Sequence, residues 1–169
     1  MTQELIELRQ YINEGRYEQA LEIIDDLEEM SKKAILEKIK TFLIRLLIHL
    51  IKNQVEQRLT NSWAVSIRDS LLKIQSLNLK DNNKSYYIKE EDWDDYLDEG
   101  LEDAIFAASV EVFEGQYNPF QLQEHLNAEQ LKKIAYELLK MTYRYSKKTI
   151  RVEINHKLSQ FPGGEDWIN

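Results

Sequence analysis

Helix-breaking residues are scarce in this chain. Five glycines and two prolines occur among 169 residues, and these two residue types are the ones that most often end helices and form tight turns. Over most of the length, apolar residues recur at spacings of three and four, which places them on one face of an α-helix. The sequence therefore predicts an all-α fold, a compact bundle of about six helices.

The most apolar stretch, residues 35–55, is expected to be the third helix. Its apolar side chains cover more than half of the helix circumference, which is typical of a helix buried among others. Ser31 offers an N-cap for its first turn. We therefore expect this third helix to be the buried centre of the bundle. The first two helices are expected over residues 4–13 and 17–30, and later ones over about 60–77, 90–113 and 127–145.

Two segments carry further local signals. Gly15-x-Tyr17-x-x-Ala20 resembles one tetratricopeptide-type helical hairpin, but no second copy follows at the ~34-residue spacing of such repeats. Residues 149–155 alternate between apolar and polar side chains, which favours a strand. Ile150, Ile154 and Leu158 also fit helical spacing, and no partner strand is evident. We predict a helix over 149–158.

The composition excludes several kinds of chemistry. Cysteine is absent, which excludes disulfides, thiolate nucleophiles and zinc sites with sulfur ligands. The N-terminus lacks the basic segment followed by an apolar one that marks a secretory signal. The longest apolar run is shorter than the ~20 residues that a membrane crossing needs. We expect a cytoplasmic protein with no cofactor and no membrane contact.

Two charged residues, Arg45 and His49, interrupt the apolar run at a spacing of one helical turn. A buried guanidinium needs an acid and a buried imidazole needs a hydrogen bond, since an unpaired group costs ~1–3 kcal/mol or more. A hairpin between the second and third helices would return Asp25, Asp26, Glu28 and Glu29 towards them. The sequence therefore predicts a polar cluster that fixes helix register, composed of Asp26, Arg45, His49, Trp63 and Arg68.

A catalytic interpretation uses a related set of residues. Glu28 or Glu29 and His49 would act as acid and base, because the histidine pKa of ~6.5 lies near working pH. Arg68 would bind an anion. However, the sequence offers neither a nucleophile–base pair nor a phosphate-binding loop, so we favour a noncatalytic protein over this hydrolase or nuclease. We also predict no metal, since the three histidines are far apart and the acids of residues 92–103 are typical of a solvated helix face.

The net charge of −8 is unevenly distributed. Residues 81–120 hold 12 acids against two lysines, whereas residues 132–157 hold eight basic residues against two acids. Lysines and tyrosines alternate within 132–151, which favours nucleic-acid binding through phosphate contacts and base stacking. The acidic total argues against that alternative. Charge segregation instead favours a protein partner or self-association, and thus an interaction or scaffolding module.

Three stretches resemble the bacterial family catalogued as domain of unknown function 29, which is frequent in cyanobacteria. They are ELRQYINEGRYEQALEIIDDLEEMSKK, RLLIHLIKNQ and NSWAVSIRDSLLKI. The resemblance covers roughly residues 5–113 and implies a compact all-α domain without an established activity. The chain departs from the family pattern in the loop NLKDNNKSYYIKEED and in a longer basic C-terminal segment. The expected organisation is a helical core over 1–117 with a helical extension over 118–169, packed on the core in the same domain.

Overall fold

The computed structural model describes residues 2–167, and the all-α prediction is confirmed there. Within this range it contains seven α-helices and two short 3₁₀ helices, with a single isolated β-bridge between Leu79 and Tyr86. The elements are α1 (Thr2–Asn13), α2 (Tyr17–Glu56), α3 (Asn61–Asn78), η1 (Glu90–Asp92), α4 (Trp93–Ser109), η2 (Val112–Gly115), α5 (Pro119–Glu124), α6 (Ala128–Arg144) and α7 (Thr149–Ser159).

The main correction concerns the predicted turn before residue 31. Residues 17–56 form one helix of 40 residues, and Ser31 is an exposed residue in its interior rather than an N-cap. No glycine or proline lies between Tyr17 and Glu56. A serine alone does not break a helix, because its hydroxyl can point to solvent or bond within the helix. The predicted second and third helices are therefore one element.

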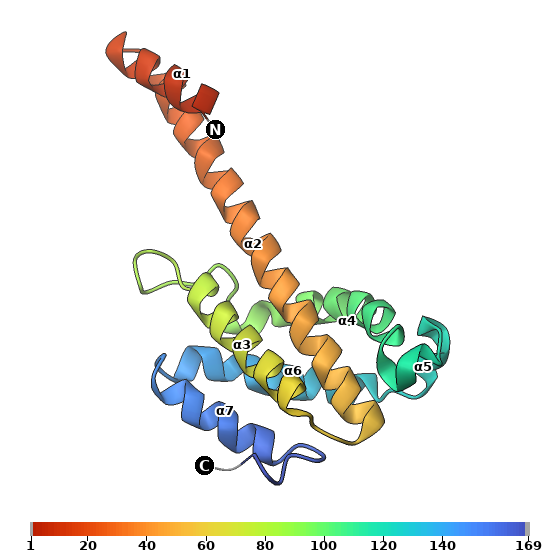
Figure 1. Cartoon of the computed structure of the whole chain (residues 1–169). Helices are drawn as coiled ribbons and strands as arrows, with labels where there is room; N and C mark the ends of the chain where they lie inside the picture. Colours follow the sequence, from red (N-terminus) through yellow and green to blue (C-terminus); the bar gives the residue numbers. More distant parts are fainter. Residues whose placement is uncertain (1, 168–169) are drawn as a thin grey trace. The chain divides into compact units, whose positions relative to one another are not determined.

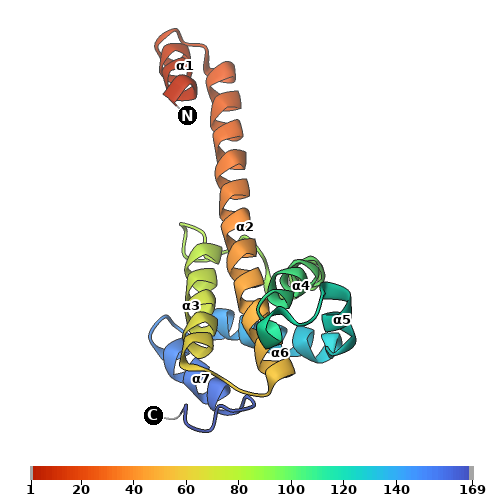
Figure 2. The same cartoon turned by 45° about the vertical axis from the view of Figure 1, so that its right-hand side comes forward.

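The chain divides into two compact units, Met1–Glu37 and Lys38–Asn169, and the division falls inside α2. Residues 118–169 belong to the same unit as residues 38–117. Within unit 1, α1 lies alongside the first turns of α2 (Figures 1 and 2). Gly15 adopts a φ of 71° in the intervening turn, a conformation that glycine reaches without steric cost.

Unit 2 contains the core of the molecule. In both views the second half of α2 lies between α3 and α4 (Figures 1 and 2). Gly100 lets α4 approach α2, because an added Cβ would lie 3.1 Å from Leu47 Cδ1. Helix α6 contacts both α3 and α4, and α7 contacts α3 and α6. The buried side chains of α2 are all within this unit except Ala20; the large apolar ones are Ile39, Leu43, Leu46, Leu47, Leu50 and Ile51.

Capping residues define several helix ends in unit 2. The Trp63 amide donates to Thr60 Oγ1 at 3.1 Å, and the Gln130 amide donates to Asn127 Oδ1 at 3.1 Å, close to where helices are expected to begin near residues 60 and 127. Asn118 and Gln121 form a reciprocal capping box at the start of α5. The segment 149–158 is helical, as predicted. The helix expected over 90–113 is shorter, because η1 precedes it and the backbone of Phe113 and Glu114 leaves the helical region.

The C-terminal tail returns to the end of α2. Asn53 is buried, and its Nδ2 donates to the carbonyl oxygens of Arg58 and Pro162 at 3.0 and 2.9 Å. Gly163 approaches the 58–59 backbone so closely that a Cβ there would lie 2.7 Å from Leu59 N. The tail therefore closes one end of the unit 2 core. No helix in the described range is long and apolar enough to span a membrane.

Candidate functional site

Arg45 finds its acid in α3 rather than in residues 25–29. Its Nη1 donates to Asp69 Oδ2 at 2.7 Å and its Nη2 donates to Ser66 Oγ at 3.3 Å. Both charged side chains are 39% exposed. Arg45 is thus paired with an acid of α3 at a partly exposed position, and not with the acids of residues 25–29, because α2 does not turn at residue 31.

His49 is half-buried in α2. Its Nδ1 lies 2.8 Å from the carbonyl oxygen of Arg45, which accepts the Nδ1 proton and leaves Nε2 unprotonated in the neutral ring. Burial lowers the pKa of the His49 imidazole below its ordinary value of 6.5, and the charges of Lys52 and Arg45 act in the same direction. His49 is therefore held mainly neutral at pH 7.

Trp63 packs against two cations at the end of α2. Arg58 lies 4.7 Å and Lys52 5.7 Å from its ring centroid. Lys52 is buried and forms an ion pair with Glu111, which lies after α4. These contacts join α2, α3 and the end of α4, which is a structural role.

The structure does not bring the proposed acid–base pair together in one hairpin. Asp26, Glu28 and Glu29 are exposed residues of unit 1. His49 and the half-buried Arg68 belong to unit 2. Since the helical turn that would have returned the acids to His49 is absent, the catalytic interpretation loses its geometric basis.

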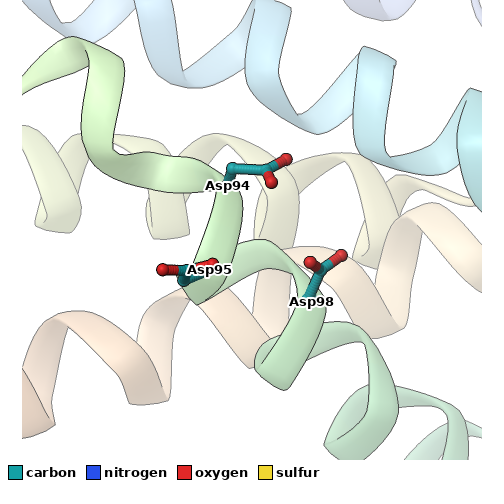
Figure 3. A group of neighbouring side chains, drawn as sticks. All are labelled: Asp94, Asp95 and Asp98. Carbon is teal, nitrogen blue, oxygen red and sulfur yellow. The ribbon is translucent and has the colours of Figure 1, made fainter.

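Three aspartates at the start of α4 form an acidic cluster (Figure 3). One carboxylate oxygen from each of Asp94, Asp95 and Asp98 lies within 4.8 Å of the others, and all three residues are exposed. Lys132 Nζ lies 2.6 Å from Asp98 Oδ1 and 3.1 Å from Asp94 Oδ1. Hydrogen bonds to Asp98 and Asp94 raise the pKa of Lys132. An internal cation therefore already balances part of this cluster.

Several groups of the basic segment 132–151 are also engaged internally. Besides Lys132, Arg144 pairs with Glu90 at 2.9 Å. Tyr143 donates its hydroxyl to the Ile88 carbonyl oxygen at 2.6 Å and accepts from Trp93 Nε1 at 2.7 Å. Burial raises the pKa of the Tyr143 hydroxyl to about 12. These groups attach α6 to η1 and α4 and are not available to stack on bases or neutralise phosphates.

A cavity of about 270 Å³ lies between the second half of α2, α6 and the tail. Leu50, Leu131 and Ile134 form its apolar part. Its amide side chains serve the chain itself, since Gln54 exchanges two hydrogen bonds with the Asn127 backbone and Gln57 donates to the Gln54 carbonyl oxygen. The volume is slightly below the ~300–1,000 Å³ typical of ligand pockets.

The strongest candidate site is the surface of unit 1. Among the described residues 3–37, Ala20 is the only buried residue. Of the periodic apolar residues of α1 and early α2, Leu8, Ile24 and Leu27 are half-buried, and several others are exposed. Tyr17 is 65% and Leu21 58% exposed, and four more large apolar side chains are about half exposed: Leu5, Ile6, Ile12 and Met30. Successive residues of an α-helix are 100° apart, so Leu5 and Ile12 share one side of α1 and Tyr17 and Leu21 share one side of α2, whereas Met30 faces away from Leu21. We call Leu5, Ile12, Tyr17 and Leu21 the hairpin surface.

The sequence predicted this hairpin but not the exposure of its apolar residues. Periodicity identifies an apolar face without showing what covers it. Exposed apolar patches of this kind mark interaction sites in soluble proteins.

No family model matches the chain, and neither a curated protein nor a solved structure matches it. The resemblance to domain of unknown function 29 therefore stays a prediction.

Proposed function

We propose that this protein is a noncatalytic interaction module and that the hairpin surface is where it docks a partner protein. The observation that carries the proposal is the burial of a single residue, Ala20, in the described part of unit 1. Two amphipathic helices that bury so little of their apolar surface are incomplete as a folding unit. A third helix on the hairpin surface would complete them.

The energetics favour such docking. A chain segment below ~40 residues rarely buries enough surface to fold without a partner or cross-link, and unit 1 spans residues 1–37. Fully burying one large aliphatic or aromatic side chain is worth ~1.5–3 kcal/mol. The four side chains of the hairpin surface are already about half exposed or more, so a partner could bury a substantial part of each.

The charge of unit 1 specifies the kind of partner. Residues 1–37 carry ten acidic and four basic side chains, a net charge of −6. Residues 18–29 hold six acids and no base. A second copy of the same hairpin would meet like charge, which is unfavourable across an interface. The complementary partner is an amphipathic helix with an apolar stripe and basic flanks.

Two polar substitutions on the hairpin surface test the proposal. Tagged protein carrying Ile12→Ser and Leu21→Ser is compared with wild type and with Val65→Ser, a control that alters an exposed apolar residue of α3. Cross-linking and affinity capture from source-cell lysate identify proteins retained by wild type and control. Each captured protein is then purified, and its binding to all three forms is measured by calorimetry.

The proposal expects a direct partner whose affinity falls at least tenfold with the double variant and is unchanged with Val65→Ser, since truncating central interface residues has effects of this size. Capture of no direct partner, or equal binding by all three forms, would reject the hairpin surface as the docking site.

A further inference from the structure

A second exposed apolar surface lies at the end of α4 in unit 2. Val110 is 73% and Phe120 70% exposed, and Phe106 and Phe113 are exposed as well. The rings of Phe106 and Phe120 meet edge to face with centroids 6.0 Å apart. Phe113 packs in the same way on Tyr117, at 5.9 Å. We call Phe106, Val110, Phe113 and Phe120 the aromatic corner.

The backbone of the aromatic corner is strained. Phe113 has φ 47° and ψ 43°, and Glu114 has φ 59° and ψ 31°. This left-handed conformation costs roughly 1–2 kcal/mol for each residue with a side chain. The Phe113 amide donates to Glu56 Oε2 at 3.3 Å, which anchors the turn to α2. Strain that places an aromatic side chain in solvent is a feature typical of recognition sites.

The exposed charged residues near the aromatic corner in sequence are acidic. Residues 90–131 contain 13 acidic side chains and neither lysine nor arginine. Glu102, Asp103, Glu114 and Glu124 are exposed residues of α4, η2 and α5. A surface that combines exposed aromatic rings with acids is complementary to an apolar surface bordered by basic residues.

Unit 2 carries such a surface on α7. Lys147, Lys148 and Arg151 are exposed beside the apolar residues Tyr145, 38% exposed, and Val152, 54% exposed. We call these five residues the basic end. The two lysines stand at the N-terminus of α7, where the helix dipole is positive. The dipole therefore does not stabilise their charges, and the lysines favour an acidic partner. In both views α5 and α7 lie on opposite sides of unit 2 (Figures 1 and 2).

We propose that the aromatic corner of one copy binds the basic end of a second copy. Because the two surfaces differ and lie on opposite sides of unit 2, the contact is heterologous and joins copies head to tail. The exposed rings of the corner would pack on Tyr145 and Val152, while the acids of α4 and α5 face Lys147, Lys148 and Arg151. This contact uses no residue of unit 1 and is independent of the proposed function.

The test uses sedimentation velocity of the purified full chain over a range of concentrations. Wild type should associate with increasing concentration, and the association should weaken as salt is raised from 50 to 500 mM. The corner variant Phe106→Ser/Phe120→Ser and the basic-end variant Lys148→Glu/Arg151→Glu should each weaken association at least about tenfold. Val65→Ser is the matched control and should behave as wild type.

Mixing the two variants gives the decisive result. The corner variant retains the basic end, and the basic-end variant retains the aromatic corner. A 1:1 mixture should therefore form heterodimers that stop at two copies, although neither variant associates alone. Equal denaturation midpoints exclude unfolding as the cause. Monomeric wild type at all concentrations, association unaffected by both variants, or a mixture without heterodimers would each overturn the proposal. The Ile12→Ser/Leu21→Ser variant should still associate, which separates this contact from the hairpin surface.

Discussion

Unit 1 and unit 2 have similar amphipathic sequences but very different interiors. Both place apolar residues at helical spacing, and α2 contributes to both. In unit 2 the α2 residues Leu43, Leu46 and Leu47 are buried, whereas in unit 1 Leu21 and Met30 remain exposed. The difference follows from the number of neighbours, because two helices can cover one side of each other and no more. Amphipathic periodicity therefore marks a surface that needs a partner, and only part of this chain supplies that partner itself.

The largest expected effect comes from truncating one leucine in each unit. Leu46→Ala should reduce the free energy of unfolding by ~2–5 kcal/mol, since Leu46 is fully buried and its removal leaves a cavity. Leu21→Ala should change it by less than ~0.5 kcal/mol in the isolated protein, as is usual for exposed positions. Urea denaturation followed by circular dichroism measures both. Similar losses for the two variants would show that the interiors do not differ.

A second comparison concerns two glycines with the same backbone conformation. Gly15 and Gly163 have φ values of 71° and 73°. A Cβ at Gly15 meets nothing within 4 Å, whereas at Gly163 it would lie 2.7 Å from Leu59 N. Gly15→Ala should therefore cost only the left-handed backbone penalty, roughly 1–2 kcal/mol.

Gly163→Ala adds a backbone clash to the same penalty and should be the more destabilising of the pair, by about 1 kcal/mol or more. Denaturation midpoints of the two variants, compared with wild type, test the ranking. The reverse order would show that the tail does not pack on residues 58–59 as described.

The sequence predicts the fold class and several helix ends for reasons that are local. Scarce glycine and proline indicate long helices, and the cap residues Thr60 and Asn127 satisfy amides within three residues of themselves. The missing turn at Ser31 shows the limit of local signals, because a serine flanked by polar residues can cap a helix or continue one. Which of these occurs depends on whether neighbouring elements pack against the end.

The candidate site could be predicted only in part. The requirement that Arg45 be paired with an acid follows from its apolar surroundings, but the choice of Asp69 depends on how α2 and α3 pack. The left-handed backbone at Phe113 could not be predicted from the sequence. Glycine is the usual sign of that conformation, and the nearest glycine stands two positions later, at Gly115. Likewise, Leu5 and Ile12 fit a core face by spacing but are about half exposed, because spacing alone does not show whether a further element covers such a face.

The pH dependence of stability should also differ between the two units, because His49 lies in unit 2 and unit 1 contains no histidine. The folded-state pKa of His49 lies below its ordinary value of 6.5. Its contribution to stability should therefore be complete above about pH 6.5, where both states are neutral. It should be lost as the pH falls through the folded-state pKa, since the unfolded chain binds the proton first.

His49→Gln should accordingly reduce the dependence of the denaturation midpoint on pH between 7 and 5. The pH dependence of amide exchange in unit 1 should not differ between wild type and variant. An imidazole NMR titration that gives His49 a pKa at or above 6.5 would contradict the burial described for this ring.

The smallest expected effect compares one ion pair from each unit. Arg45 and Asp69 join α2 to α3 at 2.7 Å, whereas Arg16 and Glu14 are two residues apart at 3.3 Å. A double-mutant cycle on Arg45→Ala and Asp69→Ala should give a coupling of roughly 0.5–1 kcal/mol, at the upper end for partly exposed pairs, because the pair links two packed helices. The corresponding cycle on Arg16 and Glu14 should give no measurable coupling, since both ends move with the same exposed turn. A coupling for Arg16–Glu14 as large as that for Arg45–Asp69 would mean that the unit 1 turn is as rigid as the α2–α3 contact. Unit 1 would then be more ordered on its own than its burial of a single residue implies.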